Sequence, residues 1–280
     1  MPWRHMQNLV RLVEQLKRKH APEQMLINHI REYLQVLILK SIAHSQFSSA
    51  LSFMGGTALR ICYDLKRFSE DLDFALDRPA RGYSFQKVLN AVQRDLEAAG
   101  YEIEISGAAE KTVEKAFVKL SKVLYPLGLS ARENQKIHIK IEVDTKPVNV
   151  DDDQLESFFV TKFDEIFPIL KHRLETLFAG KITAILSRSY AKGRDYYDLI
   201  WYLSRKTRID MKYLNAGIKG GELKPFKTEA DVIRHVANIV AEVHPEKILK
   251  DIGRFLEDPT EERWLRDYQR VFDKLASPLL

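Results

Sequence analysis

Two aspartates stand two residues apart in a short segment whose residues alternate between polar and apolar. In residues 71–76, Leu72 and Phe74 fall on one side of an extended chain, and Asp71 and Asp73 fall on the other. Two carboxylates that point the same way from a strand can coordinate a hard divalent cation, such as Mg²⁺ or Mn²⁺, in one site. The structural alternative is an exposed edge strand whose aspartates meet only solvent. The spacing therefore makes Asp71 and Asp73 candidate metal ligands.

A Gly-Gly pair stands upstream of this strand, at the end of a short apolar run. Residues 51–54 read as a strand, Gly55 and Gly56 as a turn, and a helical pattern starts at Thr57. Without Cβ atoms the backbone can approach a phosphate closely, and both the N–H groups at the helix start and the Thr57 hydroxyl can donate to it. Phosphoryl transfer from a triphosphate requires such donors together with carboxylates that hold metal ions. Taken alone, the dipeptide is more typical of an ordinary tight turn with Thr57 as the helix cap.

A third carboxylate on another strand would complete a two-metal site. Residues 137–145 alternate strictly, and Glu142 lies on their polar face. Asp144, two residues further along the same face, is the alternative to Glu142. The neighbouring Lys140 and Lys146 are also consistent with a face that is simply solvated.

The order of these features resembles the first motif of a known family. Residues 54–60 (Met-Gly-Gly-Thr-Ala-Leu-Arg), followed by residues 67–74 (Arg-Phe-Ser-Glu-Asp-Leu-Asp-Phe), are similar to the AbiEii/AbiGii abortive-infection toxins. These are nucleotidyltransferases of the DNA polymerase β type, and the family includes the MenT toxins. The resemblance continues at Lys181, which opens a helical pattern, and at residues 194–199 (Arg-Asp-Tyr-Tyr-Asp-Leu). It is absent from the first 45 residues and beyond about Leu203.

The resemblance implies roles for several residues. Asp71 and Asp73 would bind metal, Lys181 would contact the triphosphate, and Asp198 or Asp195 would support the site. Each of the last three has a structural alternative. Lys181 can be a solvated helix lysine, whereas Asp195 and Asp198 can cap or open a helix that follows Gly193.

Two further residues of the first motif are candidates for the nucleotide site, Arg67 and Ser69. Ser69 stands two residues before the first aspartate. Some members of the family carry a serine there that becomes phosphorylated when the toxin is silenced.

The pattern of the whole chain predicts an α+β fold, with a polymerase β-type core of mixed sheet and flanking helices. The first 45 residues read as helices, further strands are expected at residues 101–105 and 116–124, and the chain is expected to be helical from Lys171 onward. We therefore expect two domains. Residues 1–168 would hold the N-terminal helices and the nucleotidyltransferase domain, and residues 169–280 a helical domain.

Composition limits the classes of protein that remain. The net charge of +5 favours a polyanionic partner without requiring one. A single cysteine, Cys62, excludes an intramolecular disulfide framework and a multi-cysteine zinc site. The N-terminus lacks the apolar core of a signal peptide, and no apolar run is long enough to span a bilayer. A cytoplasmic protein without membrane contact is expected.

The function expected from the resemblance is transfer of a nucleoside monophosphate from an NTP to an RNA, with a tRNA 3′ end as acceptor. The protein would act as a toxin paired with a cognate antitoxin. One alternative is a metal-dependent nuclease, in which Asp144-Thr145-Lys146 would form half of the site and Asp71 or Asp73 would supply the upstream acid. The other is a catalytically degenerate protein that only binds nucleotide or RNA.

Overall fold

The computed structural model describes residues 3–109, 112–188, 190–219, 221 and 223–280. The chain forms two compact units. The first, called the sheet unit below, comprises Met1–Asp64, Phe68–Pro147 and Ser157–Lys171. The second, the helical unit, comprises Leu65–Arg67, Val148–Glu156 and His172–Leu280.

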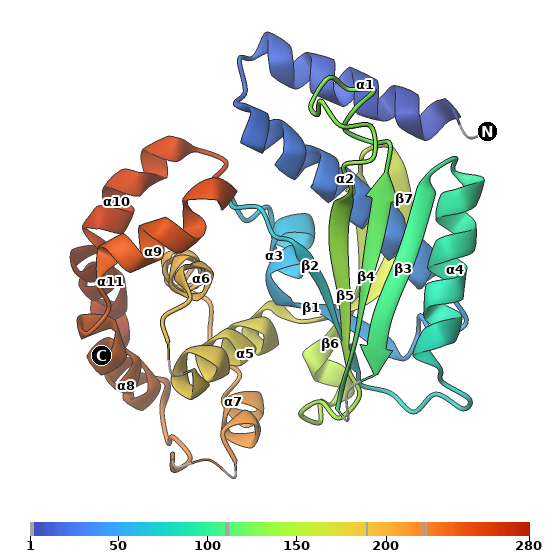
Figure 1. The fold of residues 1–280 in the computed structure, drawn as a ribbon. Coiled ribbons are helices and arrows are strands. Elements are labelled where there is room, and N and C mark those ends of the chain that lie inside the picture. Colours follow the sequence, from blue (N-terminus) through green and yellow to red (C-terminus); the bar gives the residue numbers. More distant parts are fainter. Residues whose placement is uncertain (1–2, 110–111, 189, 220, 222) are drawn as a thin grey trace. The chain divides into compact units, whose positions relative to one another are not determined.

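The sheet unit is built on a mixed sheet of seven strands in the order β3-β4-β5-β2-β1-β7-β6 (Figure 1). The pairs β1–β2, β3–β4 and β4–β5 are antiparallel, whereas β2–β5 and β1–β7 are parallel. The strands are β1 (Leu51–Met54), β2 (Asp71–Leu76), β3 (Glu102–Ala109), β4 (Val113–Ser121), β5 (Ile137–Asp144), β6 (Leu155–Lys162) and β7 (Glu165–His172). Strand β2, which carries the two aspartates, therefore lies in the middle of the sheet.

Four helices belong to the sheet unit, and they are α1 (Trp3–Arg18), α2 (Glu23–Ala43), α3 (Gly55–Tyr63) and α4 (Phe85–Ala98). Helices α2 and α4 share one hydrophobic core with the apolar face of the sheet, which includes Leu72 and Phe74 of β2. Helix α1 joins this core through Leu9 and Val13. Because side chains alternate along a strand, the buried Leu72 and Phe74 leave Asp71 and Asp73 on the opposite face.

The helical unit contains α5 (Leu174–Ser187), α6 (Gly193–Ser204), α7 (Met211–Gly217), α8 (Glu229–Ala241), α9 (Pro245–Ile252), α10 (Glu262–Arg266) and α11 (Tyr268–Ala276). Aromatic residues fill its core. The rings of Phe178 and Tyr202 stack at 4.4 Å between centroids, and the buried Tyr268 hydroxyl donates to the carbonyl of Tyr196 at 2.8 Å. None of the described helices is long and apolar enough to cross a membrane.

Three details differ from the sequence-based prediction. Strands β6 and β7 form a hairpin where no strand was expected, and its turn residues Phe163 and Asp164 both have positive φ, at 55° and 61°. Such turns are usually signalled by Gly or Asn, so this sequence hides the hairpin. Helix α3 starts at Gly55 instead of Thr57. The C-terminal part of the region predicted as helical is divided into α10 and α11 around Asp267.

The two units also differ from the predicted division into residues 1–168 and 169–280. The main change of unit falls between Lys171 and His172, because β7 continues the sheet to that point. Two short pieces, Leu65–Arg67 and Val148–Glu156, belong to the helical unit although they lie within the predicted first domain. The helical unit is thus assembled from three separate stretches of sequence.

Candidate active site

Strand register brings the predicted carboxylates onto one face of the sheet. In the parallel pair of β2 and β5, Asp73 lies opposite Glu142 and Asp71 lies opposite Lys140. The side chains of Asp71 and Glu142 are 24% and 23% exposed, so solvent and ligands can reach them. Asp144 lies opposite Ala75, one step beyond the carboxylate pair. Its carboxylate accepts the backbone N–H of Lys146 at 2.9 Å and so closes the turn after β5.

A lysine stands among these carboxylates. The Nζ of Lys140 is 3.3 Å from Oδ2 of Asp71 and 3.0 Å from Oε2 of Glu142, and the Nζ of Lys115 is 3.9 Å from Oε1 of Glu142. Burial by itself would lower the pKa of Lys140, but the contacts with Glu142 and Asp71 outweigh it and hold that pKa above its ordinary value. A fixed cation therefore already balances part of the negative charge of this face.

Gly55 allows the Asp73 carboxylate to lie against the backbone at the first residue of α3. Its φ is +77°, and a Cβ atom at this position would lie 2.2 Å from Oδ2 of Asp73. No side chain fits there, because nonbonded heavy atoms do not approach so closely. The absence of a side chain at Gly55 is therefore used here by the Asp73 carboxylate, and the predicted approach of a phosphate to this backbone stays a prediction.

The donor set of this face fits a hard divalent cation, because Asp71, Asp73 and Glu142 all present carboxylate oxygens. Within the described part of the chain, however, no three His, Cys, Asp or Glu side chains already converge as a metal site. Lys140 is one physical reason, since its ammonium group lies between the carboxylates of Asp71 and Glu142. The metal roles of the three carboxylates remain a prediction.

The hydroxyl of Thr57 is engaged within the fold, and its role as a phosphate donor stays a prediction. Thr57 is fully buried, and its hydroxyl donates to the backbone carbonyl of Asp71. It does not cap α3, since that helix begins at Gly55. The contact ties α3 to the start of β2 and so helps to set the position of the first aspartate.

In the helical unit, five charged residues form one ion-pair network, and four of them belong to the predicted motifs. Arg67 donates to both carboxylate oxygens of Asp198, at 2.7 and 2.6 Å. The Nζ of Lys181 lies 2.8 Å from a carboxylate oxygen of Asp198 and 2.8 Å from one of Asp195. Arg188 pairs with the second oxygen of Asp195. Lys181 thus lies in the middle of α5 and reaches two carboxylates of α6.

Burial and pairing compete in this network. Burial by itself would raise the pKa of Asp198, but the charges of Arg67 and Lys181 and their hydrogen bonds outweigh it, and that pKa lies below its ordinary value. Burial lowers the pKa of Lys181, and the charges of Arg67 and Arg188 act in the same direction against the pull of Asp198. Three cations face two carboxylates, so the network carries one excess positive charge.

Arg67 is buried and paired, and its role as a nucleotide contact stays a prediction. Arg67 is 1% exposed, and Nε and Nη2 of its guanidinium group donate to the two carboxylate oxygens of Asp198. Arg67 therefore acts on Asp198 as a positioning residue. Ser69, two residues later, belongs to the sheet unit and is 9% exposed, and its carbonyl accepts from Gln35 at 3.1 Å.

Two members of these clusters were missed as site residues. Lys140 has a sequence signal, because it stands two residues before Glu142 and a strand of period two must place both on one face. Arg188 has no such sequence signal. It follows the last residue of α5, and its ion pair with Asp195 forms only in the folded chain.

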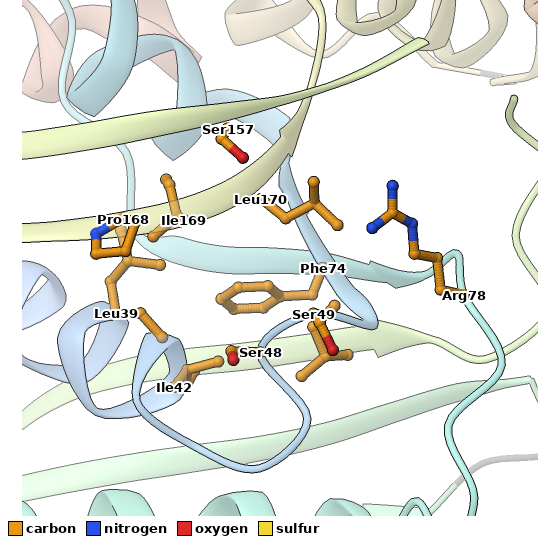
Figure 2. Close-up of a pocket in the computed structure, with 12 residues that line it drawn as sticks. Leu39, Ile42, Ser48, Ser49, Phe74, Arg78, Ser157, Pro168, Ile169 and Leu170 are labelled. Carbon is orange, nitrogen blue, oxygen red and sulfur yellow. The ribbon is translucent and has the colours of Figure 1, made fainter. Parts of the chain in front are cut away.

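A separate cavity of about 220 Å³ lies in the sheet unit and is lined by residues of α2, β1, β2, β6 and β7 and of the neighbouring loops. Figure 2 shows the Phe74 ring in the middle of its lining. The lining is otherwise mainly aliphatic, with three serines, and Arg78 is its one charged side chain. None of the candidate metal ligands lines this cavity, so it is distinct from the carboxylate face.

Comparison with known proteins identifies a family that spans most of the chain. The model of the family "Nucleotidyl transferase AbiEii toxin, Type IV TA system" matches residues 37–279. The yeast protein "Regulator of drug sensitivity 2" from Saccharomyces cerevisiae is 31% identical over 126 residues, which are 44% of this chain. That match covers 24% of the yeast protein, so the chain corresponds to about a quarter of it.

Two solved structures from Helicobacter pylori share the fold. The crystal structure of JHP933 is 16% identical, with a TM-score of 0.53 over 90% of this chain and 94% of its own. A structure described as "putative nucleotidyltransferase from H. pylori" is 17% identical, with a TM-score of 0.54 over 89% of this chain and 96% of its own.

The contact between Gly55 and Asp73 predicts a specific cost for adding one methyl group. Gly55→Ala should lower the free energy of unfolding by more than about 2 kcal/mol, because a positive φ and a steric clash coincide there. The matched control is Gly82→Ala. Gly82 has a similar φ of +69°, but a Cβ atom there would meet nothing within 4 Å, so only the backbone strain of about 1 kcal/mol should appear. Urea unfolding measures both, and equal losses would show that the clash with Asp73 is unimportant.

The buried Arg67–Asp198 pair predicts a loss that a surface pair does not show. Arg67→Met should lower the free energy of unfolding by about 3–5 kcal/mol, because it leaves Asp198 buried with half of its partners. Adding Asp198→Asn should recover part of that loss. Arg94→Met, which breaks the exposed pair with Asp95, should cost less than about 1 kcal/mol. Chemical denaturation of the four proteins tests this, and an Arg67 effect as small as that of Arg94 would contradict the positioning role.

Proposed function

Because the chain belongs to the AbiEii nucleotidyl transferase toxin family of type IV toxin–antitoxin systems, we propose that it transfers a nucleoside monophosphate from an NTP to an RNA hydroxyl. The proposed acceptor is a tRNA 3′ end, and the proposed metal is Mg²⁺ or Mn²⁺. The observation that carries the proposal is the shared face of Asp71, Asp73 and Glu142, with the backbone of Gly55 against Asp73. The family also implies an antitoxin as partner.

The residues of the sheet unit suit the requirements of this reaction. Asp71 and Asp73 would hold the divalent cation, which supplies positive charge to the phosphates during transfer. The backbone N–H groups at Gly55 and Gly56 would donate to a phosphate, which can approach them more closely because neither residue has a side chain. The acceptor oxygen forms a bond to the α-phosphorus, pyrophosphate leaves, and Glu142 accepts the proton of the acceptor hydroxyl.

We assign Lys181 the triphosphate contact, with Asp195 and Asp198 as the residues that orient it. Its side chain is 14% exposed, and its ammonium group is held by both carboxylates. The excess positive charge of the network with Arg67 and Arg188 favours an additional anion. A triphosphate oxygen is the anion that the proposed reaction provides.

The nuclease alternative has less support. It requires Asp144 and Lys146 as a catalytic pair, but the carboxylate of Asp144 accepts the backbone N–H of Lys146 and lies opposite Ala75. Of Glu142 and Asp144, the two carboxylates that follow Lys140 on β5, Glu142 is the one that lies opposite Asp73 in the strand register. The degenerate alternative is opposed by the presence of both aspartates on the face of β2.

Removal of a metal carboxylate should abolish transfer without unfolding the protein. We expect Asp71→Asn or Asp73→Asn to lower incorporation of labelled NTP into RNA by at least about a thousandfold, with the free energy of unfolding changed by less than about 1 kcal/mol, since Asp71 contributes only a partly exposed ion pair. Each of the four NTPs is incubated with total RNA and Mg²⁺. Asp144→Asn is the matched control and should stay active. Full activity of Asp71→Asn would refute the proposed site.

The companion variant Lys181→Ala should weaken triphosphate binding and leave metal binding intact.

Replacing the lysine among the carboxylates should strengthen metal binding. Lys140→Met removes a cation that competes for Asp71 and Glu142, so the nucleotide-free protein should bind Mn²⁺ about tenfold more tightly. Lys140→Arg keeps the charge and should bind like the unchanged protein. Lys119→Met is the control, because Lys119 is also 25% exposed and paired on the sheet, but with Glu104. Electron paramagnetic resonance of free Mn²⁺ measures the affinities, and equal affinity in Lys140→Met would show that Lys140 does not compete.

A further inference from the structure

The net charge of the chain is concentrated at its N-terminus. Residues 1–20 contain five Lys and Arg residues and one acidic residue, a net charge of +4, whereas the whole chain has +5. The remaining 260 residues are thus nearly neutral. The basic character that favours a polyanionic partner comes almost entirely from α1 and the residues that follow it.

The cations of this segment are presented to solvent. Arg11, Lys17, Arg18 and Lys19 are all exposed, and none of the four has an ion pair with a described residue. By contrast, most lysines and arginines near the carboxylate face and in the helical network are paired. Unpaired charges of one sign raise the local potential, because no neighbouring carboxylate cancels them.

A loop with an exposed aromatic ring lies beside the basic end of α1. The Nζ of Lys17 donates to the carbonyl of Leu127 at 3.1 Å, and the N–H of Gly128 donates to the carbonyl of Tyr125 at 3.0 Å. The Tyr125 side chain is 51% exposed, and Arg132 of the same loop is exposed as well. In Figure 1 this loop, between β4 and β5, runs close to α1. Cations and an aromatic ring therefore share one surface of the sheet unit.

We propose that this surface, formed by Arg11, Lys17, Arg18, Lys19 and Tyr125, docks the RNA acceptor. Lysine and arginine side chains neutralise phosphates, and an exposed aromatic ring stacks on an unpaired base. The proposal rests on the proposed function for the presence of an RNA acceptor. It extends that function to a part of the chain outside the family match, which begins at residue 37.

Two other polyanions fit this surface less well. A membrane-surface helix needs an apolar face that can enter the bilayer, but Leu9 and Val13 of α1 are buried against the rest of the sheet unit. An acidic protein would be served by the cations alone and leaves no role for the exposed Tyr125 ring. RNA uses both features.

The experiment compares two triple variants of the full chain with equal loss of charge. One is Arg11→Gln/Arg18→Gln/Lys19→Gln in the proposed surface. The control is Arg263→Gln/Arg270→Gln/Lys274→Gln, three exposed cations of α10 and α11 that also lack ion pairs with described residues. Binding of fluorescein-labelled bulk tRNA, and of a labelled oligoribonucleotide with a single-stranded 3′ end, is followed by anisotropy at several salt concentrations without NTP.

The surface variant should bind at least about tenfold more weakly at about 50 mM salt, and its plot of log affinity against log salt should be shallower by about two. The control should change little. Tyr125→Ala should weaken binding about tenfold, whereas Tyr125→Phe, which keeps the ring, should bind normally. Circular dichroism verifies that each variant is folded.

Equal losses in both triple variants would overturn the proposal, because net charge alone would then explain binding. Unchanged RNA affinity of the surface variant would also overturn the proposal. So would a surface variant that binds RNA normally but has lost affinity for vesicles with anionic lipid or for an acidic protein. The binding measurement is made without NTP and does not depend on nucleotide transfer. A protein that binds RNA through this surface but transfers no nucleotide would therefore refute the proposed function and leave the docking surface intact.

Discussion

The pairing of β2 with β5 is the constraint on which the candidate site depends. Because side chains alternate along a strand, β2 supplies Leu72 and Phe74 to the core and Asp71 and Asp73 to the other face. A shift of one residue would bury both aspartates and expose two large apolar side chains. The same hydrophobic burial that fixes the register therefore also fixes the carboxylates, and it sets Asp73 level with Glu142.

Charge compensation is the second constraint, and the two units meet it differently. On the sheet, Lys140 lies among partly exposed carboxylates, where each ion pair contributes little to stability and a ligand can replace it. In the helical unit, Arg67 and Asp198 are almost completely buried, and neither charge could remain there without its partner. The first arrangement suits a site that exchanges cations. The second suits a rigid support that keeps Lys181 in place.

Much of the candidate site could be predicted from the sequence because its signals are local. The period of two along residues 71–76 and 137–145 placed the carboxylates on one face of each strand, and the Gly-Gly pair marked the point where β1 ends and α3 begins. Each of these inferences needs only the geometry of a single element. The sequence predicted Lys181, Asp195 and Asp198 as separate motif residues but not the ion pairs between them. No local signal joins α5 to α6.

The sequence by itself determined the α+β class, the shared direction of the two aspartates of β2 and the change from strand to helix at the glycine pair, since hydrophobic period and backbone sterics act over a few neighbouring residues. Only the tertiary structure decided the partners across long separations. It turned Arg67 toward Asp198, 131 residues away, gave the Thr57 hydroxyl to the backbone of Asp71, and formed the β6–β7 hairpin around a turn without glycine. A side chain with several hydrogen-bond donors can bond to many different partners. Which partner it bonds to depends on the polar groups that the folded chain buries beside it.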